Sequence, residues 1–208
     1  MSGRVSEVNR VDGLPDWEMV FRFTSGRLSL SFCATVGERW RRSFERLRAP
    51  DDLGRWLEQA GLNDPAVAVT IDHLQEARRL REAIYRLVRA AMTGDEGDEA
   101  DRAVVNEFAR ETPVAAQIGS DGQRETWTGS DPVTAGLATV ALDAVELLTS
   151  PDVARVRECD APDCALLFWD TSRPGRRRWC ADGACGSRSR SAAYRARRSA
   201  PTPLGGLA

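Results

Sequence analysis

Residues 159–198, CDAPDCALLFWDTSRPGRRRWCADGACGSRSRSAAYRARR, decide how the C-terminal part of this chain folds. They include four of the five cysteines, arranged as C-x4-C, fifteen intervening residues and a second C-x4-C. Two thiol pairs on a hairpin-length spacer suit a tetrahedral zinc site, because each pair surrounds one side of the metal. Disulfides or simple core packing are the alternatives, and disulfides need an oxidising compartment. We therefore predict one structural zinc ion per chain, bound by Cys159, Cys164, Cys180 and Cys185.

The residues between and after the thiol pairs predict a small module built around the metal. Residues 166–169 form a short apolar run typical of a strand, residues 172–175 form a turn, and residues 176–179 lead the chain back. This spacer is therefore predicted to be a hairpin. No helix breaker follows Gly186, so we expect a helix from there to Arg198, with the positive end of its dipole near the thiolates. The whole unit is expected to be treble-clef-like.

The second thiol pair lies in a motif that resembles the CGNR zinc finger family, whose signature is R-x-W-C followed by C-G-N-R and a basic helix. The matching residues are Arg177, Trp179, Cys180, Cys185, Gly186, Ser187 and Arg188. Ser187 stands where the family has Asn. Serine can still cap a helix start, so we expect the fold to be kept, whereas the role of the family's amide is open.

The rest of the chain resembles the ABATE domain that precedes such fingers, which implies a transcription regulator. We expect an ABATE-like domain over residues 1–152, the finger over 153–198 and a disordered, Pro/Gly-rich tail over 199–208. The family typically has an Asp and an Asn near residue 33, where this chain has Ser31 and Ala34. A family ligand site there is expected to be weakened or altered.

Hydrophobic periodicity predicts an α+β fold in which helices pack with short antiparallel hairpins. Residues 17–23 and 27–32 alternate apolar and polar around Ser25 and Gly26, which predicts a first hairpin. Residues 38–48 are ambiguous. Helices are expected over residues 50–60, 70–92, 100–110 and 131–149. A second hairpin is expected from residues 114–118 paired with residues 123–128.

The sequence also predicts the position of one helix and of two single side chains. The helix of residues 131–149 keeps apolar spacing throughout, so we expect it in the core. Cys33 has apolar neighbours and is expected in the core as well. His73, the only histidine, is expected at the surface or bonded to a partner, because four cysteines already complete the zinc site.

Composition narrows the class of protein. The chain has 208 residues, enough for one medium domain and a zinc module, and 42% of them are hydrophobic. No apolar run of membrane-spanning length and no signal peptide is recognised, which predicts a cytoplasmic protein without a membrane partner. Nucleotide-binding, nucleophile-elbow and zinc-protease motifs are lacking, and four thiolates leave no open position on the metal. We predict that the protein is not an enzyme.

The charge distribution favours nucleic acid as a partner. Residues 155–198 carry eleven Arg and five acids, so they contribute +6, while the rest of the chain carries −8. All 29 basic residues are Arg, which GC-rich coding explains as well as selection for phosphate contacts does. The residues expected to contact DNA are Arg176, Arg177, Arg178, Arg188, Arg190, Arg195 and Arg197.

Other functions remain open at the level of sequence. The zinc module could be structural in a protein-interaction or small-molecule-binding protein, with its arginines paired to the acidic larger domain. A thiol-based redox switch is a third and weaker alternative. If the protein is a regulator, a small-molecule effector at the N-terminal domain and a homodimer are further partners that the resemblance leaves open.

Overall fold

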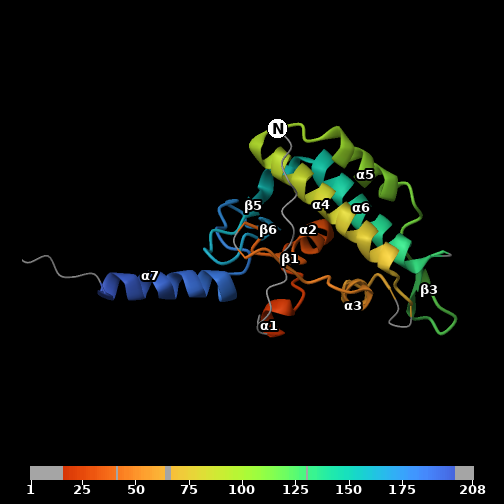
Figure 1. Cartoon of the computed structure of the whole chain (residues 1–208), viewed down its shortest axis with the longest axis horizontal. Coiled ribbons are helices and arrows are strands. Elements are labelled where there is room, and N and C mark those ends of the chain that lie inside the picture. Colours follow the sequence, from red (N-terminus) through yellow and green to blue (C-terminus); the bar gives the residue numbers. More distant parts are fainter. Residues whose placement is uncertain (1–15, 41, 64–66, 130, 200–208) are drawn as a thin grey trace, which may run out of the picture.

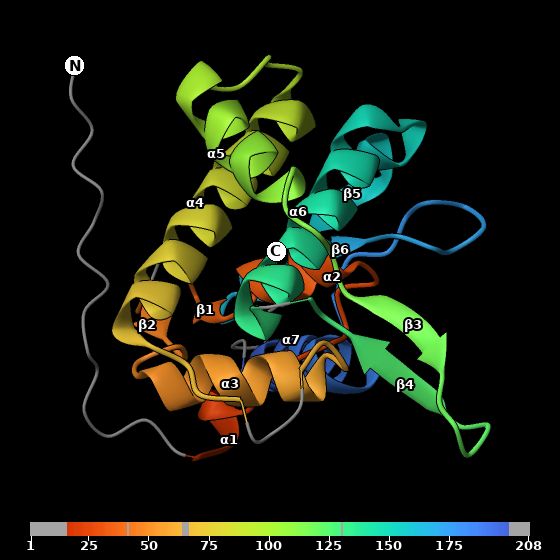
Figure 2. The same ribbon diagram turned by 90° about the vertical axis from the view of Figure 1, so that its right-hand side faces the viewer.

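The computed structural model describes residues 16–40, 42–63, 67–129 and 131–199. Helices dominate it, and three of them lie side by side in both views (Figures 1 and 2). These are α4 (Ile71–Thr93), α5 (Glu99–Ala109) and α6 (Pro132–Thr149). The short helix α2 (Leu28–Cys33) packs against α4 and α6, while α1 (Asp16–Met19) and α3 (Pro50–Gln59) lie below them in Figure 1.

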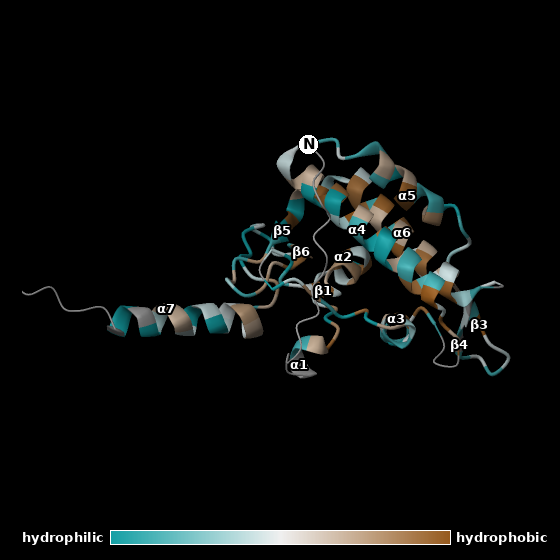
Figure 3. Cartoon of the chain, viewed as in Figure 1, coloured by the Kyte–Doolittle hydropathy of each residue, from teal (hydrophilic) through white to brown (hydrophobic). Residues whose placement is uncertain are grey.

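Helix α6 is the centre of the core. Asp131 caps its start by accepting hydrogen bonds from the backbone N–H groups of Val133 and Thr134, and Pro132 occupies the first turn. Hydrophobic colours concentrate where α4, α5 and α6 face one another (Figure 3). Nine residues of α6 are buried, which confirms the predicted core helix: Val133, Ala135, Gly136, Leu137, Ala138, Val140, Ala141, Ala144 and Leu147.

The apolar length of α6 corrects one expectation. By length and composition it could cross a membrane, and it is the one such helix in the described part of the chain. Half of that segment is buried inside the fold, against α2, α4 and α5. This packing is that of a core helix rather than of a helix facing lipid.

Helix α4 is fixed at both ends and along its length. Thr70 accepts a hydrogen bond from the backbone N–H of His73 at the start, and Gly94 ends the helix in the left-handed conformation. His73 lies near the surface with its Nε2 3.4 Å from Asp131 Oδ2, which agrees with the expected partner-bonded histidine. Midway along α4, the buried guanidinium of Arg81 forms an ion pair with Glu45.

The first predicted hairpin is wrong. Residues 17–23 and 27–32 form α1, an irregular segment and α2 instead of two strands. The alternation in LSLSFC does not mark a solvent face, because its serines are buried too. Ser29 donates from its backbone N–H and its hydroxyl to Asp143 Oδ2 of α6, at 2.8 and 2.5 Å, and the Ser31 hydroxyl bonds to Arg27 O. Hydrogen bonds to these partners allow short polar side chains to enter the core.

The remaining elements of the N-terminal domain lie close to the positions predicted from the sequence. Helices α3, α4 and α5 begin and end within one or two residues of their predicted bounds. The second hairpin is confirmed as β3 (Ala115–Ile118) paired antiparallel with β4 (Arg124–Trp127). The ambiguous segment contains a two-residue pair, β1 (Val36–Gly37) with β2 (Phe44–Glu45). The predicted α+β class, with helices and short antiparallel strand pairs, is therefore correct.

Replacing Val140 by Asp tests the position of α6. The Val140 side chain is fully buried, so the carboxylate would lie unpaired in the core and lower the free energy of unfolding by at least about 3 kcal/mol. Thr149→Asp, at the exposed end of the same helix, adds the same charge and should cost far less. Chemical denaturation followed by circular dichroism measures both. An unchanged midpoint for Val140→Asp would contradict the core placement.

Candidate metal centre

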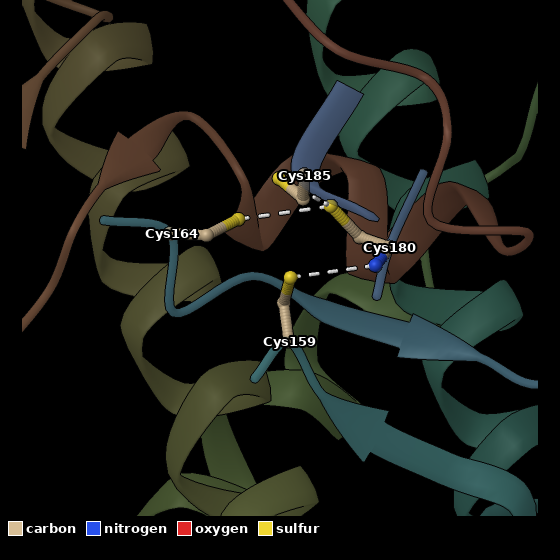
Figure 4. A group of neighbouring side chains, drawn as sticks. All are labelled: Cys159, Cys164, Cys180 and Cys185. Carbon is tan, nitrogen blue, oxygen red and sulfur yellow. Dashed lines mark hydrogen bonds between the residues drawn. The ribbon is translucent and has the colours of Figure 1, made fainter. Parts of the chain in front are cut away.

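Four cysteines from two parts of the C-terminal segment converge on one point (Figure 4). Cys159 directly follows β5 (Val156–Glu158), and Cys164 lies in the turn that leads to β6 (Leu167–Trp169). Cys180 and Cys185 belong to the second pair, Cys185 within a π-helical turn, η2 (Asp182–Gly186), that runs directly into α7 (Ser187–Ser199). The two predicted thiol pairs therefore face each other across a common centre.

The spacing of the sulfur atoms fits a tetrahedral metal site. All four cysteines are buried, and their Sγ atoms lie within 4.8 Å of one another. The Sγ of Cys180 is 3.6 Å from that of Cys164 and 3.7 Å from that of Cys185. A zinc–sulfur distance of about 2.3 Å gives tetrahedral edges of about 3.8 Å, whereas a disulfide would need about 2.05 Å. The arrangement matches zinc ligation, and the two-disulfide alternative does not fit.

Hydrogen bonds around the sulfurs favour the thiolate form of Cys159 over that of Cys164. The backbone N–H of Cys180 donates to Cys159 Sγ at 3.4 Å, and Arg188 Nη2 donates to Cys185 Sγ at the same distance. Hydrogen bonds from the neighbouring thiols, that of Cys164 first, lower the pKa of the Cys159 thiol, while contact with Cys159 raises the pKa of Cys164. The surrounding thiols thus stabilise a single thiolate, that of Cys159. Four thiolates at this spacing would repel one another, so holding them together requires a cation at their centre.

The strand pairing within the module differs from the predicted hairpin. Strand β6 pairs with β5, with Val156 opposite Trp169, so the hairpin encloses the first thiol pair instead of using residues 176–179 as its return strand. The reason is the buried carboxylate of Asp170, which accepts hydrogen bonds from the backbone N–H groups of Ser172 and Arg177. These bonds turn the chain away from the sheet directly after β6.

The apolar run before Asp170 serves two cores at once. Leu166 and Phe168 pack with the cysteines, whereas Leu167 belongs to the main core and Trp169 packs against that core. Alternate side chains of a strand point to opposite faces, so this strand is buried on both sides. The zinc module is therefore built onto the larger domain through a shared strand.

Contacts from α2 and the loop before it complete the junction. Ala34 is buried in the same apolar cluster as the cysteines, and the backbone N–H of Trp169 donates to Ser25 O at 2.8 Å. Gly26, with φ of 81°, lies against Trp169, where a Cβ would approach its carbonyl oxygen to 3.3 Å. Ser31 and Ala34, where we expected an altered family ligand site, are both buried and used for internal bonding and packing.

Arg177 and Arg188, two of the seven arginines predicted to contact DNA, bond to the metal-binding cysteines or to groups beside them. Arg177 donates to the carbonyl oxygens of Trp179 and Cys180, at 3.2 and 2.5 Å, and its guanidinium lies 4.8 Å from the Phe168 ring centroid. Arg188 contacts the Cys185 sulfur and also pairs with Asp163 of the first thiol loop. Both side chains hold the module together, which the motif alone did not reveal.

The other five predicted arginines are exposed, as Arg188 also is. Arg178 pairs with Asp160, and Arg190 pairs with Asp182 at 2.8 Å while lying over the Trp179 ring. Their ion pairs stay within the module, so their guanidinium groups remain at its surface. The side chains without an ion pair to a carboxylate in the described residues are those of Arg176 and Arg197, and Arg195 is exposed on α7 as well.

Removal of one ligand tests the metal assignment. Purified protein should contain about one zinc per chain, and Cys180→Ser should lose the metal and unfold the C-terminal module, because structural zinc contributes on the order of 10 kcal/mol to such folding. Cys33→Ser is the matched control: Cys33 is also buried, burial raises the pKa of its thiol to about 12, and it lies outside the sulfur cluster. Metal analysis by mass spectrometry measures both variants. Full zinc content in Cys180→Ser would contradict the assignment.

Comparison with known families agrees with the geometry. A family model named ABATE, with the description "Putative stress-induced transcription regulator", matches residues 26–151, which is more than half of the chain. The CGNR zinc finger model matches residues 155–198, which include all four cysteines. No curated protein matches the chain. The chain therefore belongs to the ABATE family and carries a CGNR zinc finger whose Cys159, Cys164, Cys180 and Cys185 are placed to hold one structural zinc ion.

Proposed function

We propose that the protein is a cytoplasmic transcriptional regulator that contacts DNA through its zinc finger, with a sensing or assembly role for the N-terminal domain. The observation that carries this proposal is the position of α7. It extends away from the rest of the molecule (Figure 1), and every described side chain from Arg190 to Arg198 is exposed. Most helices in proteins are stabilised by packing one face against the rest of the fold, and α7 lacks such a face over these residues. Its surface is therefore available to an external partner.

The charge of α7 indicates which kind of partner. Its sequence SRSRSAAYRARRS contains five arginines and no acid. Tyr194 is 54% exposed and lies between the arginines, where its ring and hydroxyl can contact a sugar or phosphate. The ion pairs of Arg188 and Arg190 use Asp163 and Asp182 of the finger itself rather than acids of the larger domain. This pattern favours the phosphate backbone of DNA, rather than the acidic remainder of the chain with its net charge of −8, as the partner of α7.

The strength of the field limits how such binding can work. Zinc with four thiolates carries a charge of about −2, so the +6 of residues 155–198 falls to about +4. A field of this size supports phosphate contacts but not tight binding by a single finger. We therefore expect that two copies of the chain, or the N-terminal domain as well, take part in binding DNA.

A structural zinc module without nucleic-acid binding is the second candidate. The observation in its favour is that the finger shares β6 with the larger core and uses Arg177 and Arg188 internally. On that account α7 would bind another protein. The two candidates differ in whether binding depends on salt and on the exposed arginines.

Replacing Arg176 and Arg197 by Ala separates the two candidates. Neither side chain has an ion pair within the described residues, so zinc content and folding should be kept. Two lost phosphate contacts should weaken binding to all duplexes and reduce the slope of log K against log salt by about 2. Fluorescence anisotropy with random-sequence DNA at several salt concentrations measures this slope.

The matched control removes two arginines at the far end of the molecule. Arg102 and Arg110 are exposed on and directly after α5, and their replacement by Ala changes the net charge equally. This control should leave the slope unchanged. If the parent shows no salt-dependent binding, or the Arg176 and Arg197 double variant binds as the parent does, the structural candidate is correct.

A further inference from the structure

A small cavity lies between the N-terminal domain and the zinc module. It has a volume of about 40 Å³, which is room for ordered water, and pockets for small ligands are typically about ten times larger. Arg46, from the residue after β2, lines it together with Cys164 and Arg188 of the zinc module. The cavity therefore brings a guanidinium of the larger domain to the edge of the metal centre.

Arg46 is a buried charge without a carboxylate partner. Its side chain is 3% exposed, and it donates to Glu18 O at 2.7 Å and to Ala34 O at 2.8 Å. Within the described residues no ion pair joins it to an acid, in contrast to buried Arg81, which pairs with Glu45 and Glu82. Burial lowers the pKa of Arg46 to about 10, so it stays charged at neutral pH. A buried charge of this kind needs a compensating one nearby.

The metal centre has the opposite imbalance. Zinc with four thiolates carries about −2 and is buried, so two positive charges would neutralise it. Arg188 supplies one of them through its 3.4 Å hydrogen bond to Cys185 Sγ. Arg46 lines the same cavity as Cys164, and Ala34, whose carbonyl oxygen accepts a hydrogen bond from Arg46, packs in the same cluster as the thiols. This arrangement places the second guanidinium at the edge of the thiol cluster.

We propose that Arg46 and Arg188 are the two counter-charges of the zinc–thiolate centre, and that Arg46 makes metal retention depend on the N-terminal domain. Arg22 and Arg42 also line the cavity, so binding of a free anion is an alternative role for it. That role is disfavoured because Arg42 already pairs with Glu18 and Glu38, and Arg188 with Asp163. Arg46 is thus a positioning residue of the metal site from a part of the chain outside the finger. The inference does not depend on DNA binding.

The test compares Arg46→Gln with Arg46→Lys in the full chain. Gln can still donate a hydrogen bond to Ala34 O but has no charge, whereas Lys keeps the charge. Zinc affinity, measured by competition with a chromogenic chelator, should fall by about 10- to 100-fold in Arg46→Gln, and Lys should stay closer to the parent. Arg48→Gln, an exposed neighbour two residues away, should leave the affinity unchanged.

Folding is followed by circular dichroism in the same samples. Because Arg188 is exposed at the start of α7, Arg188→Gln gives a second arm that leaves the N-terminal domain intact, and it should also weaken zinc binding. The proposal is overturned if Arg46→Gln is folded and binds zinc as tightly as the parent does. It is also overturned if Arg46→Lys and Arg46→Gln lower the zinc affinity equally, or if Arg188→Gln leaves the zinc affinity unchanged.

Discussion

The meeting of four thiolates at one point is the constraint on which the C-terminal structure depends. Apart from the cysteines, the buried cluster contains, among the residues that the structure describes, Ala34, Ala161, Leu166 and Phe168, with Trp179 and Ala181 packed against it. So few apolar side chains cannot offset the loss of conformational entropy of the whole segment. The metal must supply the difference, and it fixes the first thiol loop, the η2 turn and the start of α7 relative to one another.

Strand β6 connects the metal centre to the larger domain, because its side chains pack in both cores. Leu167 and Phe168 are adjacent in sequence, yet one belongs to the main core and the other to the thiol cluster. Shifting this strand by one residue would exchange the two cores, so its register is strongly fixed. Glu158, directly before the first ligand, accepts hydrogen bonds from Trp40 at 2.6 Å and from Arg89 of α4. The finger is therefore an extension of the domain, although the sequence divides into two family segments.

Local signals predicted most of this structure. The helices were predictable because their apolar spacing and caps, such as Asp131 before α6 and Gly94 after α4, agree with their tertiary positions. The zinc ligands were predictable because metal geometry restricts cysteine spacing. The first hairpin and the return strand of the spacer hairpin were predicted wrongly. In both places a polar side chain forms hydrogen bonds that the local sequence does not indicate. Ser29 bonds to Asp143, which allows a helix in place of a strand, and Asp170 redirects the chain after β6. Arg46 had no local signal, since its role depends on residues far along the chain.

The account rests on the claim that Cys159, Cys164, Cys180 and Cys185 together bind one zinc ion. X-ray absorption at the zinc edge, on the purified full chain, tests it most directly because it counts the ligand atoms around the metal. The account predicts a first shell of four sulfur atoms at about 2.3 Å with no nitrogen or oxygen. A shell containing nitrogen or oxygen ligands in place of one or more sulfurs would contradict it.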